Sequence, residues 1–84
     1  MLVVTVRYFA GARSAAGLPY EAIELTPGAT VDDVLMALRE RHGEALSRVL
    51  TASSLLLDEV AVRDRSVLVS AGAVLDVLPP FAGG

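Results

Sequence analysis

The order of apolar and polar residues along the chain predicts two short strands joined by a helical segment. Residues 2–9 alternate, as a strand with one buried face does, and residues 20–25 alternate again. The apolar face of the first strand carries Leu2, Val4, Val6 and Tyr8. The small residues 10–17 predict a short helical turn that ends at Gly17 and Pro19. Because this connection is long, we expect the two strands to pair as a hairpin without a tight turn.

The clearest helix begins after Thr30 and ends at Gly43. Thr30 is a good N-cap, and Asp33 three residues later gives a shortened capping box. The apolar side chains recur at helical spacing: Val31, Val34, Leu35 and Leu38. Gly43 stands where a left-handed residue commonly ends a helix. We expect a shorter helix over residues 44–50 beyond it.

Short apolar runs close the chain and predict the remaining strands. Residues 55–57 and 60–62 flank a turn at 58–59, and residues 74–78 form the last strand. Asp76 marks one face of that last strand as the wetter one. The pattern predicts an α+β domain with a mixed sheet of four or five strands. One main helix packs across one face of this sheet and leaves the other face open.

Composition narrows the classes of function. The 84 residues suffice for one small domain, and 54% of them are hydrophobic. A net charge of −3 without a basic run argues against nucleic acid as a partner. No apolar run approaches the ~20 residues that span a bilayer, and no signal peptide is evident, so we expect a cytoplasmic protein without a membrane partner. With no cysteine, no lysine and one histidine, neither a metal site nor catalysis by this chain alone is expected.

The last residues, Leu-Pro-Pro-Phe-Ala-Gly-Gly, carry the most specific chemical signal. Each proline disfavours the α region for the residue before it, and the glycines lack a Cβ that would clash in a narrow cleft. The sequence therefore predicts a folded domain over residues 1–78 and an extended reactive tail over 79–84. The reacting group of such a tail would be the carboxylate of Gly84. An inert, frayed terminus is the ordinary alternative.

Three stretches together resemble a known family. They are Tyr8-Phe9-Ala10 with Arg13 and Gly17, Gly28-Ala29-Thr30-Val31, and the ending from Val77 to Gly84. The chain resembles the small subunits of molybdopterin synthase, which belong to the ubiquitin-like β-grasp sulfur carriers. Two turns depart from the family pattern: Asp58-Glu59 replaces a frequent Asn-Gly, and Ala73-Val74 follows Gly72 in place of Asp-Glu. Both departures lie away from the tail, so they bear on partner fit more than on chemistry.

The resemblance implies a reaction shared between proteins. An ATP-dependent activating enzyme adenylates the carboxylate of Gly84, and a sulfur donor then displaces AMP to leave a thiocarboxylate. The chain binds no cofactor of its own; the glycyl adenylate and the thiocarboxylate are modified forms of its end. It docks on the large subunit of the synthase and delivers sulfur to a pterin precursor of the molybdenum cofactor. The chain is then not an enzyme alone, because the large subunit completes the chemistry.

Several residues are candidates for partner binding. In the tail, Gly83 keeps the arm slim, Pro80 stiffens it, and Phe81 either anchors in a groove of the partner or folds back on the domain. Phe9 and Leu78 lie on the wetter sheet face and form either a docking patch, which Val62 could join, or a second small core.

Arg13 is the basic residue that we single out. It either meets a carboxylate of the partner or is simply solvated.

Two other classes of function remain open. The chain could carry sulfur for thiazole or cysteine synthesis, or act as a ubiquitin-like modifier that forms isopeptides with lysines. It could also be a β-grasp interaction module without covalent chemistry. An added residue after Gly84 would abolish function in the carrier and modifier cases and leave the interaction module unharmed.

Overall fold

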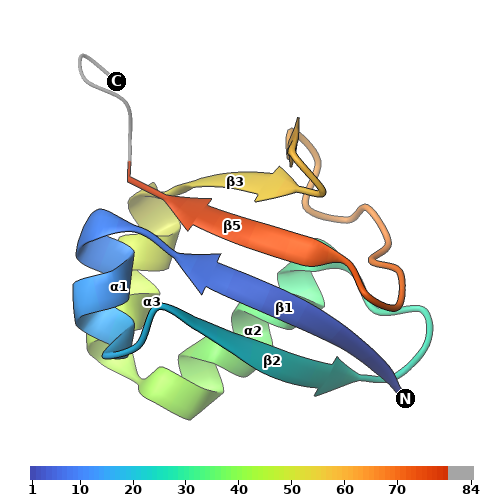
Figure 1. The fold of residues 1–84 in the computed structure, drawn as a ribbon, viewed down its shortest axis with the longest axis horizontal. Helices are drawn as coiled ribbons and strands as arrows, with labels where there is room; N and C mark the ends of the chain where they lie inside the picture. The colour runs from blue at the N-terminus through green and yellow to red at the C-terminus, as the bar shows by residue number, and fades with distance from the viewer. Residues whose placement is uncertain (80–84) are drawn as a thin grey trace.

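The computed structural model describes residues 1–79. It shows a five-stranded mixed sheet with helices packed along one side (Figure 1). The elements in chain order are β1 (Leu2–Tyr8), α1 (Ala10–Ala16), β2 (Tyr20–Leu25), α2 (Val31–His42), α3 (Glu44–Ala52), β3 (Ser54–Leu57), β4 (Val60–Ala61) and β5 (Val74–Leu78). These elements confirm the α+β class and the strands and helices predicted from the pattern. Among residues 1–79, none of the helices has the length and apolar character needed to cross a membrane.

The strand order is β2-β1-β5-β3-β4, so the first and last strands lie side by side. β1 pairs antiparallel with β2, as the predicted hairpin requires, and parallel with β5. β3 pairs antiparallel with both β5 and β4. The sheet is therefore mixed, and its one parallel contact joins residues about seventy positions apart.

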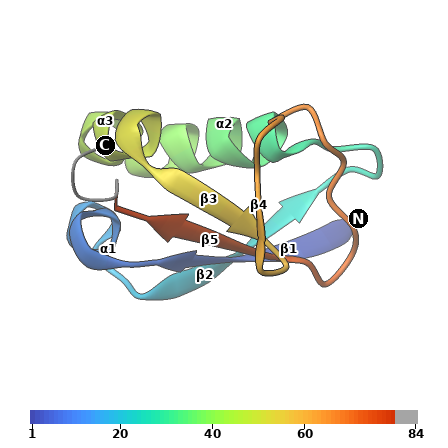
Figure 2. The ribbon, with the colours of Figure 1, turned by 90° about the horizontal axis from the view of Figure 1, so that it is seen from above.

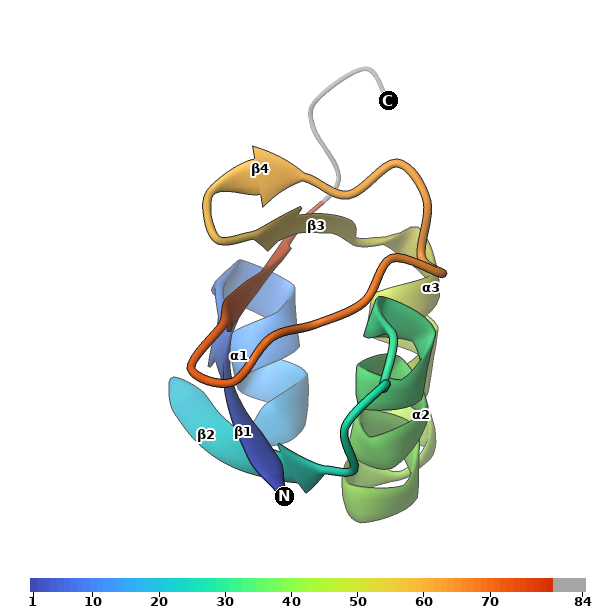
Figure 3. The ribbon, with the colours of Figure 1, turned by 90° about the vertical axis from the view of Figure 1, so that its right-hand side faces the viewer.

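The core lies between the sheet and the helices. Figures 2 and 3 show α2 and α3 running along one side of the strands, while α1 closes the end of the core beside α3. The even-numbered side chains of β1 point into this core, and so do the apolar stripe of α2 and the inner residues of β5. Burial of these apolar side chains is the main force that holds the layers together.

The start of α2 agrees with the sequence, and its end differs. The Thr30 Oγ1 accepts from the backbone N–H of Asp33 at 3.2 Å, and the Asp33 carboxylate accepts from the N–H of Thr30 at 2.8 Å, which confirms the capping box. Gly43 has a φ of +83° but a ψ of −156°. It is therefore extended in the mirror-image sense, and the predicted left-handed helical conformation was wrong. This conformation lets α3 begin at once, at an angle to α2.

The turn between β3 and β4 confirms the prediction for residues 58–59. Both Asp58 and Glu59 have positive φ, +48° and +71°. Asp58 is fixed to the neighbouring strand because it donates its N–H to the Val74 carbonyl (2.8 Å) and accepts the Val74 N–H on Oδ1 (2.9 Å). Asn-Gly adopts two successive positive φ angles more readily than Asp-Glu does, so the backbone at Glu59 is strained.

A partly buried polar cluster joins β1, β2 and the end of α2. The carboxylate of Glu21, whose side chain is 7% exposed, is its centre. The Tyr8 hydroxyl donates to it at 2.5 Å and Arg41 Nη1 at 2.8 Å, while His42 Nε2 contacts the oxygen that Tyr8 binds. Burial alone would raise the pKa of Glu21, but these partners together lower it. His42 and Arg41 thus connect the C-terminal end of α2 to Glu21 on β2.

Gly43 gives the first test of the fold. We expect Gly43→Ala to destabilise the protein by about 1–3 kcal/mol, because an L-residue is strained in this backbone conformation. A Cβ at Gly43 meets no atom within 4 Å, so the loss would come from the backbone alone. Gly11→Ala is the matched control, since Gly11 lies in α1 with equal space and should gain up to about 1 kcal/mol. Urea unfolding of both variants measures the difference; an unchanged midpoint for Gly43→Ala would contradict the assignment.

The Glu21 cluster predicts an acid-dependent part of the stability. Because the pKa of Glu21 is lower in the folded state, its contribution is present above the ordinary value of 4.5 and is lost as the pH falls below it. We expect Glu21→Gln to lower the free energy of unfolding at neutral pH by about 2 kcal/mol. The difference in the free energy of unfolding between the wild type and the variant should become smaller below pH 4.5. Unfolding curves at several pH values would show this, and a constant difference would contradict it.

Candidate functional site

The sheet face that points away from the helices is the candidate site, and we call it the open face. Figures 2 and 3 show that no helix of residues 1–79 covers it. Alternation along the strands assigns its members, which are Val3, Thr5, Arg7, Phe9, Tyr20, Ala22, Glu24, Ser54, Leu56, Ala61, Val74, Asp76 and Leu78. Most of these side chains are apolar. The expectation that the main helix leaves one sheet face open is thereby confirmed.

One row of residues crosses the open face through all five strands. Arg7 lies opposite Tyr20 on one side and Asp76 on the other, Asp76 lies opposite Leu56, and Leu56 lies opposite Ala61. The middle of the face therefore holds one pair of opposite charges between apolar or aromatic neighbours.

Arg7 and Asp76 form a two-pronged ion pair. Arg7 Nε donates to Oδ1 of Asp76 at 2.5 Å, and Nη2 donates to Oδ2 at 2.8 Å. The hydrogen bonds and the charge of Asp76 raise the pKa of Arg7. Asp76 is only 5% exposed, although its charge had marked this face as the wetter one. The face is open, but its carboxylate is buried because the guanidinium beside it satisfies both oxygens.

Phe9 and Leu78 meet at the end of the open face. They follow Tyr8 and Val77, the last paired residues of two parallel strands, and the Phe9 N–H donates to the Val77 carbonyl at 3.1 Å. Phe9 is 39% exposed, so it does not belong to a second core under a loop. Its ring centroid lies 6.0 Å from Cζ of Arg7. The structure thus brings the two predicted patch residues together, beside the point where the chain continues through Pro79.

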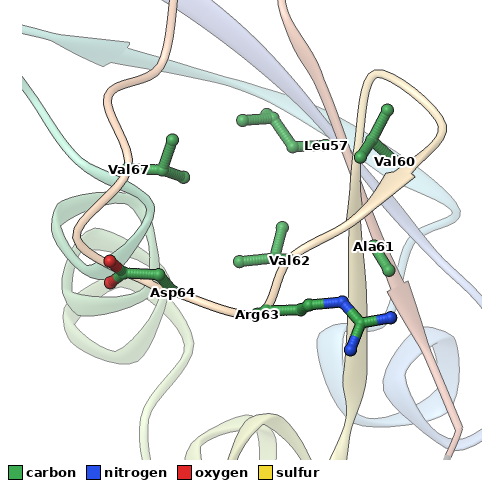
Figure 4. A pocket seen from close by; sticks show the side chains of 7 residues that line it. All are labelled: Leu57, Val60, Ala61, Val62, Arg63, Asp64 and Val67. Atoms are coloured by element: carbon green, nitrogen blue, oxygen red, sulfur yellow. The ribbon is translucent and has the colours of Figure 1, made fainter.

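Val62 and Arg13 lie elsewhere. Val62 packs partly against the core and lines a hollow at the β4 edge with Leu57 and Val67 (Figure 4). β5 and β3 separate that edge from Phe9 at the end of β1. Val62 also packs on the core side of the sheet, whereas Leu78 belongs to the open face, so the structure brings Val62 to neither residue. Arg13 is exposed on α1, outside the open face. Partner binding by Val62 and by Arg13 stays a prediction.

The remaining predicted site residues belong to the tail. Pro80, Phe81, Gly83 and Gly84 lie outside the described residues. Their assigned roles, and the division of the chain into residues 1–78 and 79–84, therefore stay predictions. Among residues 1–79 no group of three histidine or acidic side chains is placed to hold a metal ion.

Arg7 was not among the site residues predicted from the sequence. An arginine in the middle of the first strand and an aspartate in the middle of the last are the available signal. That signal becomes specific only when the two strands are known to be neighbours in a given register, which the sequence pattern does not show.

Comparisons with known proteins agree with this geometry. The sequence profile of the ThiS family matches residues 6–84. A curated relative from Chlamydomonas reinhardtii, named molybdopterin synthase sulfur carrier subunit, is 32% identical over 83 residues, which cover 96% of this chain and 98% of the relative.

Solved structures give the same result for the fold. A putative molybdopterin converting factor subunit 1 from Pyrococcus furiosus matches with a TM-score of 0.83 and 26% identity, covering 96% of this chain and 100% of the other. Small archaeal modifier protein 1 of Haloferax volcanii matches with a TM-score of 0.85 and 27% identity over 96% and 100% of the two chains.

A third structure, from Helicobacter pylori, is a complex of subunits 1 and 2 of the molybdopterin-converting factor. It matches with a TM-score of 0.73 and 22% identity, and the alignment covers 99% of this chain and 100% of the other. At that identity the match supports the fold alone. With the family profile spanning nearly the whole chain and these folds superimposing on it, the chain belongs to the ThiS family and has the ubiquitin-like β-grasp fold.

Proposed function

We propose that this chain is the sulfur carrier subunit of a molybdopterin synthase and that the carboxylate of Gly84 is its reacting group. The family match carries the proposal, because it runs through the Gly-Gly pair to residue 84. The relative that is 32% identical bears the name of this subunit and aligns over almost its whole length. Without cysteine in the chain, sulfur cannot be held as a persulfide on a side chain.

The chemistry is covalent activation followed by transfer. A carboxylate is a poor electrophile, so an activating enzyme first joins it to AMP from ATP and releases pyrophosphate. Hydrosulfide supplied by a sulfur donor then attacks the acyl carbon and AMP leaves, which gives a thiocarboxylate at Gly84. The terminal sulfur is the nucleophile that is passed to the pterin precursor.

The folded domain contributes docking and position. Phe9 and Leu78 lie where the last strand leads into Pro79, so a partner that covers this end of the open face also receives the residues that follow. Holding the tail in the partner's site replaces a bimolecular encounter by a local one. The partners that we propose are the large synthase subunit, the ATP-dependent activating enzyme and the sulfur donor. The first of these is supported by the 32% identical relative, which is named as the sulfur carrier subunit of this synthase.

A ubiquitin-like modifier is the second candidate. The similarity to small archaeal modifier protein 1 of Haloferax volcanii, at 27% identity, favours it. The same adenylated carboxylate would then be captured by a lysine amine of another protein. Since this chain has no lysine, it could accept no copy of itself on a side-chain amine. Conjugates would carry one copy of the chain at each modified lysine.

Intact mass tests the proposed chemistry. The protein is incubated with ATP, its activating enzyme and a sulfur donor. We expect a mass increase equal to the replacement of one oxygen by sulfur, because only the terminal carboxylate is converted. Transfer is then measured by adding the large subunit and the pterin precursor and following the return to the original mass.

Two variants serve as controls for this experiment. Deletion of Gly84, and addition of one alanine after it, should both abolish the mass increase while leaving the fold unchanged by circular dichroism. An unmodified wild-type mass, with an activating enzyme that is competent on another carrier, would contradict the carrier chemistry. Loss of free protein into lysine-linked adducts, with no thiocarboxylate, would instead favour the modifier.

A further inference from the structure

We propose that Arg7, fixed by Asp76, is the specificity-determining contact of the open face and that it binds a neutral carbonyl oxygen of the partner. The inference rests on the proposed function, because it concerns the face on which the partner subunit docks. It assigns a role to the one ion pair at the centre of that face and describes the chemistry of the surface that fits it.

The position of Arg7 is the first step. It lies in the middle row of the open face, with Tyr20 opposite it on β2, and Phe9 beyond it toward the tail. Its side chain is 47% exposed, whereas that of Asp76 is 7% exposed. The carboxylate thus serves as a buried support, and the guanidinium is the part that a partner can touch.

The guanidinium is also held in one orientation. Two parallel hydrogen bonds to Asp76 fix its plane, and the Phe9 ring lies at the outer limit of a cation–π contact. An arginine that is already ordered loses little side-chain entropy when a partner binds. Fixed donors can therefore discriminate between surfaces that place an acceptor opposite them and surfaces that do not.

The unused donors define what the partner must offer. A guanidinium has five N–H groups, and within residues 1–79 those of Arg7 bond only to Asp76. A partner that covers the apolar surroundings of Arg7 removes water from the remaining N–H groups. That burial is unfavourable unless the partner supplies acceptor oxygens.

Local charge selects a neutral acceptor. Asp76 already balances Arg7, and Glu59 also lies close enough to raise the pKa of Arg7. Arg7 lines a hollow with Val74, Asp58 and Glu59. This part of the face therefore has an excess of negative charge, and another carboxylate would be repelled. Main-chain or amide carbonyl oxygens, on an otherwise apolar surface, fit it best.

The test is calorimetric titration with the large synthase subunit from the same genome. We expect Arg7→Lys to weaken binding about tenfold, because lysine keeps the charge but not the fixed fork of donors. Arg48→Lys is the matched control. Arg48 also pairs with a carboxylate, that of Glu44 at 3.2 Å, but both side chains lie on the exposed side of α3, so we expect no change in the binding affinity. The affinity of the wild type should vary little between low and high salt, because a neutral acceptor adds no net charge pair.

Other results would overturn the inference in distinguishable ways. If Arg7→Lys binds like the wild type while Phe9→Ala binds more weakly, the open face is used but Arg7 does not determine specificity. If wild-type binding falls steeply with salt and the neutral variant Arg7→Gln loses this dependence, the acceptor is a carboxylate. If Phe9→Ala also binds like the wild type, the partner does not use this face, and the mass measurement still decides the proposed function by itself.

Discussion

The parallel pairing of β1 with β5 is the contact on which the rest of the structure depends. It places residues 5–8 beside residues 74–77 in the centre of the sheet. The inner side chains of both strands form the middle of the core, and the outer ones form the Arg7–Asp76 pair. The same register sets Leu78 beside Phe9, so the end of the open face and the point where the chain continues through Pro79 are fixed together. A shift of one residue would turn each of these side chains to the opposite face.

Local signals in the sequence were sufficient for the elements of this fold. Alternation located the strands, the Thr30–Asp33 capping box located the start of α2, and turn residues located the β3–β4 connection. These signals act over a few residues, which is why they can be read without the structure. Their limits are equally local. Gly43 was correctly placed at a helix end. Its ψ angle depends on how α3 packs, and this packing could not be predicted from the residues around Gly43.

Pairs that are far apart in sequence could not be predicted in the same way. Alternation put Asp76 and Arg7 on the outer faces of their strands, yet only the strand order shows that they meet and that Asp76 is buried. Glu21 and His42 are likewise joined only by the packing of α2 on β2. For the site, alternation put Phe9 and Leu78 on the outer faces of their strands, and the pairing of β1 with β5 brings the two together. The sheet face on which Val62 lies could not be predicted, because it depends on the unusual turn at residues 58–59.

The position of β5 also has a consequence for synthesis of the protein. β5 fills the space between β1 and β3, yet it is made after every other element of the fold. A nascent chain that lacks it has a gap at the centre of its sheet and an incomplete core, so the domain cannot close before the last strand leaves the ribosome. Residues 79–84 emerge with or just after that strand. A chain truncated before β5 would lack Asp76 and Leu78, and with them the partner of Arg7 and the neighbour of Phe9.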